Sequence, residues 1–321
     1  MEKLQNKIDF AVIVSVKHAN PNGDPLNGNR PRVNYDGFGE LSDVCIKRKI
    51  RNRLMEMGQA IFVQSDDNRK DDYRSLRNRA EGVLKSIDMS DDKKYREAAC
   101  KEWIDVRSFG QVFAYKAAAK KAKKGKEGAE GEDEKGENAG VSIGIRGPVS
   151  IHPAFSIAPV NDRVSSIQIT KSVSGEGDGA KKASDTMGMK HRVDHGLYVF
   201  YGAINPQLAS KTGFADQDAK LIKEALASLF DNDASSARPE GSMEIVSVVW
   251  WEQNPKSKQY SSAVVHRSLS VKVKEEKSEP KTIFDYDYAL AKLVGLTPEI
   301  LDPNSFGLIK EAALKNQAAS V

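Results

Sequence analysis

The sequence has few cysteines and no long apolar run, and each shortage excludes a class of protein. Cys45 and Cys100 are the only two cysteines among 321 residues. Two cysteines cannot form a disulfide framework or a zinc site with four cysteine ligands. No segment approaches the roughly 20 consecutive apolar residues of a membrane-spanning helix, and no signal peptide opens the chain. The sequence therefore predicts a cytoplasmic protein without a membrane partner.

Residues that could form a catalytic or metal centre are equally scarce. His191 and His195 stand four apart, but they lie in a predicted strand, where this spacing does not bring two ligands onto one metal. Asp24 and Asp36 lie in polar loops and could in principle hold a metal for phosphodiester cleavage. Carboxylates in such loops more commonly cap turns. We therefore expect no metal, no cofactor, and a binding protein rather than an enzyme.

Charge of one sign is not in large excess. Lys and Arg number 49 against 45 acids, and the net charge is +4. This excess does not by itself indicate a nucleic-acid partner, so the clustering of the basic residues matters more than their total. Basic residues gather in two neighbouring stretches, the loop over residues 18–32 and a predicted helix over residues 42–57.

Residues 8–17 alternate between apolar and smaller or polar side chains, which predicts a β-strand. One face carries Ile8, Phe10, Val12, Val14 and Val16. The other face carries Asp9, Ala11, Ile13, Ser15 and Lys17. We expect the first face to pack on the core and the second face to meet a wetter environment.

The loop after this strand is stiff, basic and rich in amides. Prolines restrict its backbone, while Gly23 and Gly28 supply conformations that other residues resist. Its candidate binding side chains are Asn20, Asn22, Arg30 and Arg32. Such a loop at the end of a strand suits a phosphate or sugar backbone better than an apolar ligand. The alternative is a polar connection without a ligand.

The predicted helix begins at Ser42, a residue type that caps helix N-termini. Ile46, Ile50 and Leu54 form an apolar stripe that should pack on the apolar face of the first strand. Its cations have no acid between them, and they are Lys47, Arg48, Lys49, Arg51 and Arg53. A charge run is commonly only a solvated face. The adjacent basic loop favours a helix that contacts phosphates.

The strand pattern stops after this helix. Residues 59–104 read as charged helices, and residues 105–113 weakly match the aromatic strand motif that stacks on RNA bases. Because the match is imperfect, we favour packing of Phe109 and Phe113, with Arg107 exposed.

A low-complexity stretch of Ala, Lys, Glu and Gly over residues 116–140 cannot form a core. The sheet pattern resumes over residues 141–151, where Arg146 is a candidate contact. Residues 155–190 predict a hairpin-like protrusion with a glycine-rich tip.

Further strands are predicted over residues 192–204, 243–251 and 263–273, with an amphipathic helix over residues 215–230. Without the inserted segments, the elements run strand, helix, strand, strand, helix, strand. This order is typical of α+β proteins with a ferredoxin-like or RRM-like fold. We expect helices on one face of the sheet and an open second face.

Four motifs carry a resemblance to a known family. They are His18-Ala19-Asn20-Pro21-Asn22-Gly23-Asp24-Pro25, Asp105-Val106-Arg107-Ser108-Phe109-Gly110, Arg146-Gly147-Pro148-Val149 and Thr186-Met187-Gly188-Met189-Lys190. With these motifs the chain resembles the CRISPR-associated backbone subunit of the Cascade complex, the seventh Cas family, in its type I-C (Dvulg) branch. The resemblance extends over almost the entire chain, and the Asn-Pro-Asn-Gly-Asp-Pro motif is quite specific.

This resemblance implies a hand-shaped protein. The RRM-like palm would take residues 1–58 and 141–321, the helical fingers residues 59–140, and a protruding β-hairpin thumb residues 155–190. Copies would polymerise along a CRISPR guide RNA, hold it open for pairing with target DNA, and contact other Cascade subunits. The stretch over residues 116–140 is long for the family, which blurs the finger boundary.

The residues and the resemblance together predict an RNA-binding surface. Its predicted contacts are Asn20, Asn22, Arg30, Arg32, Lys47, Arg48, Lys49, Arg51, Arg107, Arg146, Met187, Lys190, His191 and Arg192. Met187 and Met189 could slide between bases at a subunit boundary, or could instead fill the palm core. The alternative function is a repeat-RNA-processing endoribonuclease, which also uses RRM-like folds and would need a general base and acid such as His18, His191 or His195.

Overall fold

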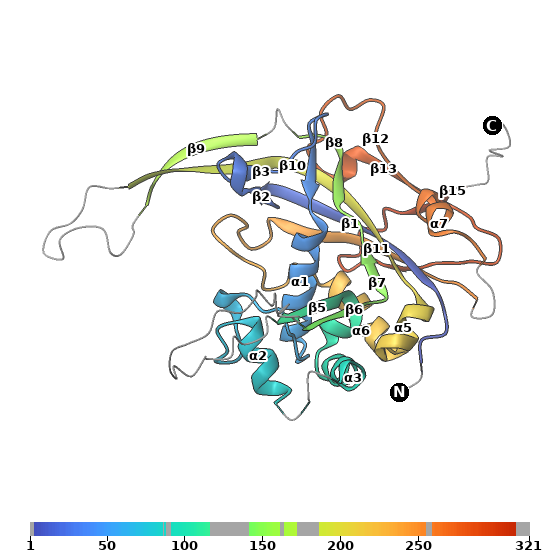
Figure 1. Ribbon diagram of the computed structural model, residues 1–321. Coiled ribbons are helices and arrows are strands. Elements are labelled where there is room, and N and C mark those ends of the chain that lie inside the picture. Colours follow the sequence, from blue (N-terminus) through green and yellow to red (C-terminus); the bar gives the residue numbers. More distant parts are fainter. Residues whose placement is uncertain are drawn as a thin grey trace, which may run out of the picture.

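An eight-stranded antiparallel sheet forms the centre of this α+β protein (Figure 1). The computed structural model describes residues 3–85, 87, 91–115, 141–160, 164–171, 186–254 and 259–312. The predicted low-complexity stretch and the glycine-rich tip of the protrusion lie outside these residues. The strand order is β14-β11-β1-β10-β8-β4, with β7 and β9 also paired to β10. The strands are β1 (Ile8–Ala19), β4 (Phe38–Leu41), β7 (Val149–Ile151), β8 (Ala154–Pro159), β9 (Val164–Lys171), β10 (Thr186–Ile204), β11 (Met243–Glu252) and β14 (Glu299–Leu301).

Strand β1 lies in the middle of this sheet, between β10 and β11. The predicted strand is therefore confirmed, and it continues two residues further, to Ala19. From Ile8 to Val16 both of its faces are buried, including the side chains of Asp9 and Ser15, and only Lys17 of the predicted second face is exposed. The prediction of a wetter second face was therefore wrong for Asp9, Ala11, Ile13 and Ser15.

Helices cover the first face of the sheet. Helix α1 (Asp43–Glu56) and helix α6 (Asp216–Ala227) pack there, next to the shorter α5 (Pro206–Thr212). Ser42 caps α1 as predicted, because its Oγ accepts a hydrogen bond from the backbone N of Cys45 at 3.3 Å. The stripe of Ile46, Ile50 and Leu54 is buried in the same core cluster as Val12.

A second, three-stranded sheet covers the other face. It has the order β12 (Leu269–Val273), β13 (Tyr286–Ala291) and β15 (Lys310–Ala312), and helix α7 (Ser262–Ser268) accompanies it. The predicted open face was wrong because Ala11 and Ile13 share that face with Leu197, and this apolar surface is buried against the second sheet. The strand predicted over residues 263–273 is half helix, since Ser261 caps α7 through the backbone N of Val264.

A helical lobe has its own core. Helices α2 (Leu76–Val83), α3 (Asp92–Glu102) and α4 (Ile104–Phe109) pack with the hairpin of β5 (Gly110–Tyr115) and β6 (Val141–Arg146). The weak strand motif over residues 105–113 therefore begins as a helix. The predicted return to the main sheet at residue 141 also differs, because β6 pairs with β5 and the main sheet resumes at β7.

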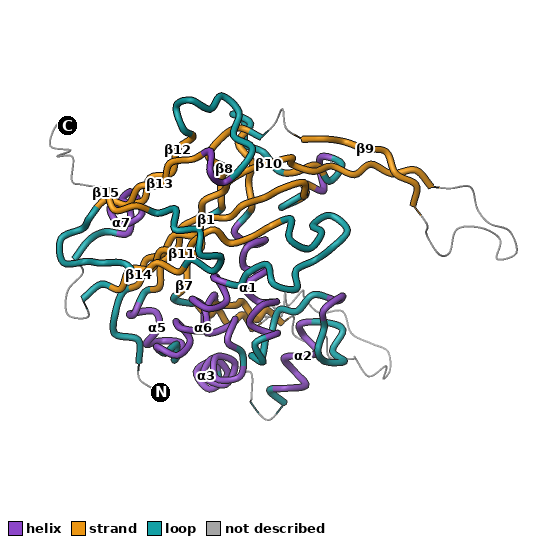
Figure 2. The backbone as a smooth tube through the Cα atoms, turned by 180° about the vertical axis from the view of Figure 1, so that it is seen from behind, coloured by secondary structure: helices purple, strands orange, loops and turns teal. Residues whose placement is uncertain are grey.

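Strand β9 and the first half of β10 project from the body as a two-stranded arm (Figures 1 and 2). Their register runs from Thr186↔Lys171 to Val193↔Val164. We call β9 with residues 186–193 the arm. Residues 155–159 of the predicted protrusion belong instead to β8 in the main sheet. No helix in the described part of the chain is long and apolar enough to cross a membrane.

Candidate nucleic-acid interface

Polar and cationic side chains lie on both faces of the arm where it leaves the body. Ser166 Oγ lies 3.2 Å from Arg30 Nη1 and 2.7 Å from His191 Nδ1. On the neighbouring rung, Arg192 Nε donates to Ser165 Oγ at 3.1 Å. The pairing of β9 with β10 explains both contacts, because Ser166 faces His191 and Ser165 faces Arg192 across the ladder. We call these five residues the arm-base cluster.

A histidine and a carboxylate extend this cluster toward β1. Ser165 Oγ donates to Asp194 Oδ1 at 3.1 Å, and His18 Nδ1 lies 3.6 Å from the same oxygen. His18 has a φ of 52°, a left-handed backbone conformation that a residue with a side chain rarely adopts. The exposed imidazole is thus held at the end of β1, beside the arm.

The short loop before the helix carries Arg30 to the arm. The loop folds into β2 (Gly23–Asp24), a single 3₁₀ turn (Pro25–Asn27) and β3 (Arg30–Pro31). Within it, Arg32 Nη2 lies 3.6 Å from Asp24 Oδ1.

Two predicted contacts, Asn20 and Asn22, hold this loop in place. Asn20 is buried, and its Nδ2 donates to Asn29 O at 2.7 Å. Asn22 Oδ1 accepts from the N and Oγ of Ser42, at 2.9 and 3.0 Å. In this structure both amides position Arg30, since their side chains bond to the loop and to the start of α1.

The outer cations of α1 have partners of their own. Lys47 Nζ lies 3.0 Å from Asp43 Oδ2. Arg48 Nη1 donates to Val63 O at 2.6 Å, and burial lowers the pKa of this guanidinium.

Deeper on α1, Lys49 is only 4% exposed and forms an ion pair with Asp233. Burial lowers the pKa of the Lys49 ammonium, and Asp233 opposes that shift. Arg51 Nε lies 2.8 Å from Asp105 Oδ2. Lys49 and Arg51 of the acid-free run are therefore each paired in space with an acid from another segment.

Arg107 lies in α4 and Arg146 at the end of β6, and both elements belong to the helical lobe. Arg107 is only 15% exposed, because its Nη2 and Nε donate to Asp218 Oδ1 at 2.7 and 3.1 Å. The prediction that Arg107 is exposed was wrong. Arg146, at the end of β6, is exposed.

The arm carries the remaining predicted contacts. Met187 and Met189 are each 55% exposed, so the alternative that they fill the core was wrong. Alternation along β10 places them on the same face as His191, while Lys190 shares the opposite face with Arg192.

Sequence reasoning missed Ser165, Ser166 and Asp194. No single segment signals them, because their partners lie on β3, β10 and β1, which are far apart in the sequence. The described part of the chain holds no group of three or more His, Cys, Asp or Glu side chains that could bind a metal. The arm-base cluster instead offers guanidinium, imidazole and hydroxyl groups, which are the donors that contact phosphate and sugar in nucleic acids.

Comparison with known proteins decides the family. The family model described as CRISPR-associated protein Cas7 matches residues 6–291. The chain belongs to the Cas7 family. A curated relative, CRISPR-associated protein Cas7 of Haloferax volcanii, is 26% identical over 222 residues, which are 68% of this chain and 62% of the relative. The match thus spans less than two thirds of that Cas7 protein.

Solved chains from CRISPR RNA-guided surveillance complexes also match. One, from a complex in a pre-nicking state, aligns over 96% of both chains with a TM-score of 0.45 and 13% identity. Another aligns over 96% of this chain and 95% of its own length, with a TM-score of 0.43 and 14% identity.

Proposed function

We propose that this Cas7 protein is the guide-RNA-binding backbone subunit of a cytoplasmic type I-C Cascade complex. Several copies would line one CRISPR RNA and present it for pairing with target DNA, beside other Cascade subunits. The observation that carries the proposal is a cationic and hydroxyl-rich cluster at the base of a projecting arm, in a chain of the Cas7 family. The motif Asn20-Pro21-Asn22-Gly23-Asp24-Pro25 supports the type I-C branch.

The chemistry of the arm-base cluster suits an RNA backbone. The guanidinium groups of Arg30 and Arg192 now donate to serine hydroxyls. A phosphate is a stronger acceptor for the same donors because it is itself ionised, so that donor and acceptor are both charged. Contacts to phosphate carry no sequence information. A subunit that must hold guides of any sequence needs contacts of this kind.

We assign the parts of a hand to the segments described above. The strands β11-β1-β10-β8, with α1 and α6 on one face, support an RRM-like palm. The separate core of the helical lobe supports fingers that begin near residue 59. The arm would be the thumb, reaching a neighbouring copy along the RNA.

The cations of α1 remain proposed RNA contacts, but with a smaller expected contribution to the affinity. Lys47 and Arg51 already pair with acids, and Lys49 is buried in its pair. A phosphate would have to share or replace those partners. We therefore expect Arg30 and Arg192 to contribute more to RNA affinity than the helix does.

We propose binding without cleavage, and the alternative endoribonuclease can be tested directly. The contact of His18 with Asp194 at 3.6 Å is the observation that favours the alternative, because a carboxylate can orient a histidine base. Repeat RNA incubated with the protein should stay intact. Cleavage that is lost in a His18→Ala variant would establish the enzyme instead.

The decisive experiment measures guide-RNA affinity as a function of salt. The double variant Arg30→Ala/Arg192→Ala should flatten the log–log salt slope by about 1.4, since each phosphate contact on a single strand contributes about 0.7. The matched control is Arg77→Ala/Arg96→Ala, which removes two arginines from exposed ion pairs on the helical lobe. Equal effects of the two variants would contradict an RNA site at the arm base.

A further inference from the structure

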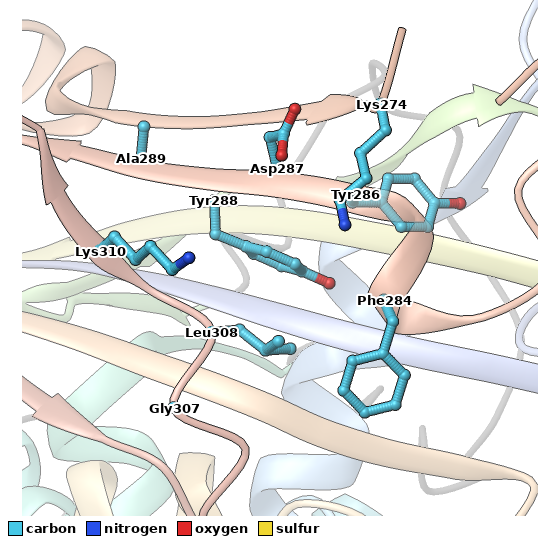
Figure 3. A pocket seen from close by; sticks show the side chains of 9 residues that line it. All are labelled: Lys274, Phe284, Tyr286, Asp287, Tyr288, Ala289, Gly307, Leu308 and Lys310. Atoms are coloured by element: carbon cyan, nitrogen blue, oxygen red, sulfur yellow. The ribbon is translucent and has the colours of Figure 1, made fainter. Parts of the chain in front are cut away.

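The second sheet contains a cleft of about 530 Å³ (Figure 3). The cleft opens between two strands of one sheet. β15 pairs with β13 only from Ala289↔Lys310 onward, and the residues before Lys310 diverge from β13. Leu308 therefore lines one wall, and Phe284 and Tyr288 line the other. A volume of this size lies within the roughly 300–1,000 Å³ that small-ligand sites occupy.

One of the rings that line the cleft is exposed. Phe284 is 57% exposed, although phenylalanine is usually buried. Its turn is held rigidly, because Asp285 Oδ2 accepts from the backbone N of Lys281 and Thr282 at 2.9 and 3.0 Å. The Phe306 ring meets it edge-on, with centroids 6.3 Å apart. The ring is thus presented to solvent by a fixed support.

Two ammonium groups point into the same cleft. In Figure 3 the side chains of Lys274 and Lys310 approach the ring of Tyr288 from different sides. The Tyr288 ring is itself fixed, since its hydroxyl donates to Ile283 O at 2.7 Å. Asp287 also lines the cleft, but its carboxylate points away from the ring. The interior is therefore aromatic and cationic together.

We propose that this cleft binds a nucleotide unit of a single-stranded nucleic acid, at a site separate from the arm-base cluster. The base would stack on Phe284, because base stacking on an aromatic ring tolerates any sequence. The phosphate would lie between Lys274 and Lys310, where two ammonium groups neutralise it. An acidic peptide could use the two lysines but would leave the exposed ring without a stacking partner, so the nucleotide fits the lining better.

The test uses the full chain and a fluorescein-labelled six-nucleotide oligothymidylate, followed by anisotropy over a range of salt. Lys274→Ala/Lys310→Ala should flatten the salt slope by about 1.4 relative to the unchanged protein. Its control is Lys272→Ala/Lys292→Ala, which removes the same amount of charge. Both control lysines are exposed, lie in or next to the second sheet, and do not line the cleft. The control should keep the slope of the unchanged protein.

A second variant separates stacking from charge. Phe284→Ala should weaken oligothymidylate binding about fivefold or more, which corresponds to the roughly 1 kcal/mol lower limit for stacking one base. Because Phe284 is exposed, the variant should have the same midpoint urea concentration for unfolding as the unchanged protein. Equal slopes for the two lysine pairs, or unchanged affinity of Phe284→Ala, would overturn the proposal. Binding of an Asp/Glu peptide that depends on the cleft lysines while oligothymidylate does not would also overturn it.

Two further measurements define the ligand and isolate this site. Displacement of the probe by uridine monophosphate would show that a free nucleotide suffices, and displacement only by an oligonucleotide would show that a strand is required. Both results support the site. Repeating the titration in the Arg30→Ala/Arg192→Ala protein distinguishes the two proposals, because cleft binding should persist there when guide binding is lost.

Discussion

Arg51 and Asp105 form an ion pair whose carboxylate is completely buried. Arg51 Nε lies 2.8 Å from Asp105 Oδ2, and the Asp105 side chain is 0% exposed. The same carboxylate accepts from the backbone N of Phe62 at 2.7 Å and of Val63 at 3.1 Å. A single side chain of α4 thereby connects the helical lobe to α1 and to the segment that follows it.

Replacing Asp105 by alanine should therefore destabilise the protein strongly. Removing one partner of a buried pair typically costs about 3–5 kcal/mol, because the remaining charge and the backbone donors lose their acceptor. Urea unfolding would measure the loss. The control Asp92→Ala breaks an exposed pair with Arg96, and such pairs are worth about 0–1 kcal/mol. Similar small losses for both variants would show that Asp105 has no anchoring role.

Stability should fall on mild acidification through His266. Burial lowers the pKa of this imidazole, and the nearby Asp9 only partly offsets the effect. The unfolded chain then binds a proton below about pH 6.5 that the folded chain does not bind, so the free energy of unfolding falls as the pH drops through that value.

The variant His266→Phe keeps the stacking on Tyr201, whose ring centroid is 4.9 Å away. It should show a smaller fall in the free energy of unfolding between pH 7 and pH 5, measured with urea at each pH. Parallel curves for the two proteins would rule out this histidine as the source.

The low-complexity stretch should be dispensable. It lies outside the described residues, but the strands at its two ends are paired from Gly110↔Arg146 to Tyr115↔Val141. Replacing residues 120–138 by a short Gly-Ser linker should change the stability by less than about 1 kcal/mol, since halving a loop changes its closure free energy by about 0.6 kcal/mol. A melting temperature lowered by several degrees, or lost guide binding, would show that the stretch is used.

The methionines of the arm, Met187 and Met189, should displace bases of the guide RNA at a regular interval. If Met187 and Met189 separate bases at each subunit boundary, chemical probing of bound RNA should show one displaced base at a regular interval. Met187→Ser/Met189→Ser should abolish that interval without unfolding the chain, because both side chains are exposed. Leu26→Ser, at another exposed apolar position, is the control. Uniform reactivity along the guide in the unchanged protein would contradict this role.

The local features of the fold could be predicted, and the long-range ones could not. The alternation of β1 and the Ser42 cap of α1 depend only on residues that are close together in the sequence, and the structure confirms both. The acids that neutralise Arg51 and Lys49 stand 54 and 184 positions away in the chain. No local pattern indicates such partners, so the helix appeared to be an uncompensated cationic surface.

The second sheet was missed for a related reason. In β1, Ala11 and Ile13 lie among polar or small residues on a face that the sequence alone indicates to be partly polar. Their contact with Leu197 and the C-terminal strands shows that this face belongs to the core. The arm-base cluster likewise depends on a cross-strand register that the sequence does not determine, because residues 172–185 separate β9 from β10 and a connection of that length does not fix the register.

Strand β10 belongs to the body and the arm at once, and this has a mechanical consequence. Residues 193–204 are fixed by pairing with β1, while residues 186–193 pair with β9. The arm is then a lever with a clamped end. From Val193 to Thr186 it extends about 24 Å, so a bend of about 10° at its base would carry its outer end about 4 Å, close to the spacing between neighbouring strands. In the assembly we propose, small adjustments beside Arg192 would therefore be amplified into the distance between successive copies, so the pitch would be set at the base of the arm rather than at its outer end.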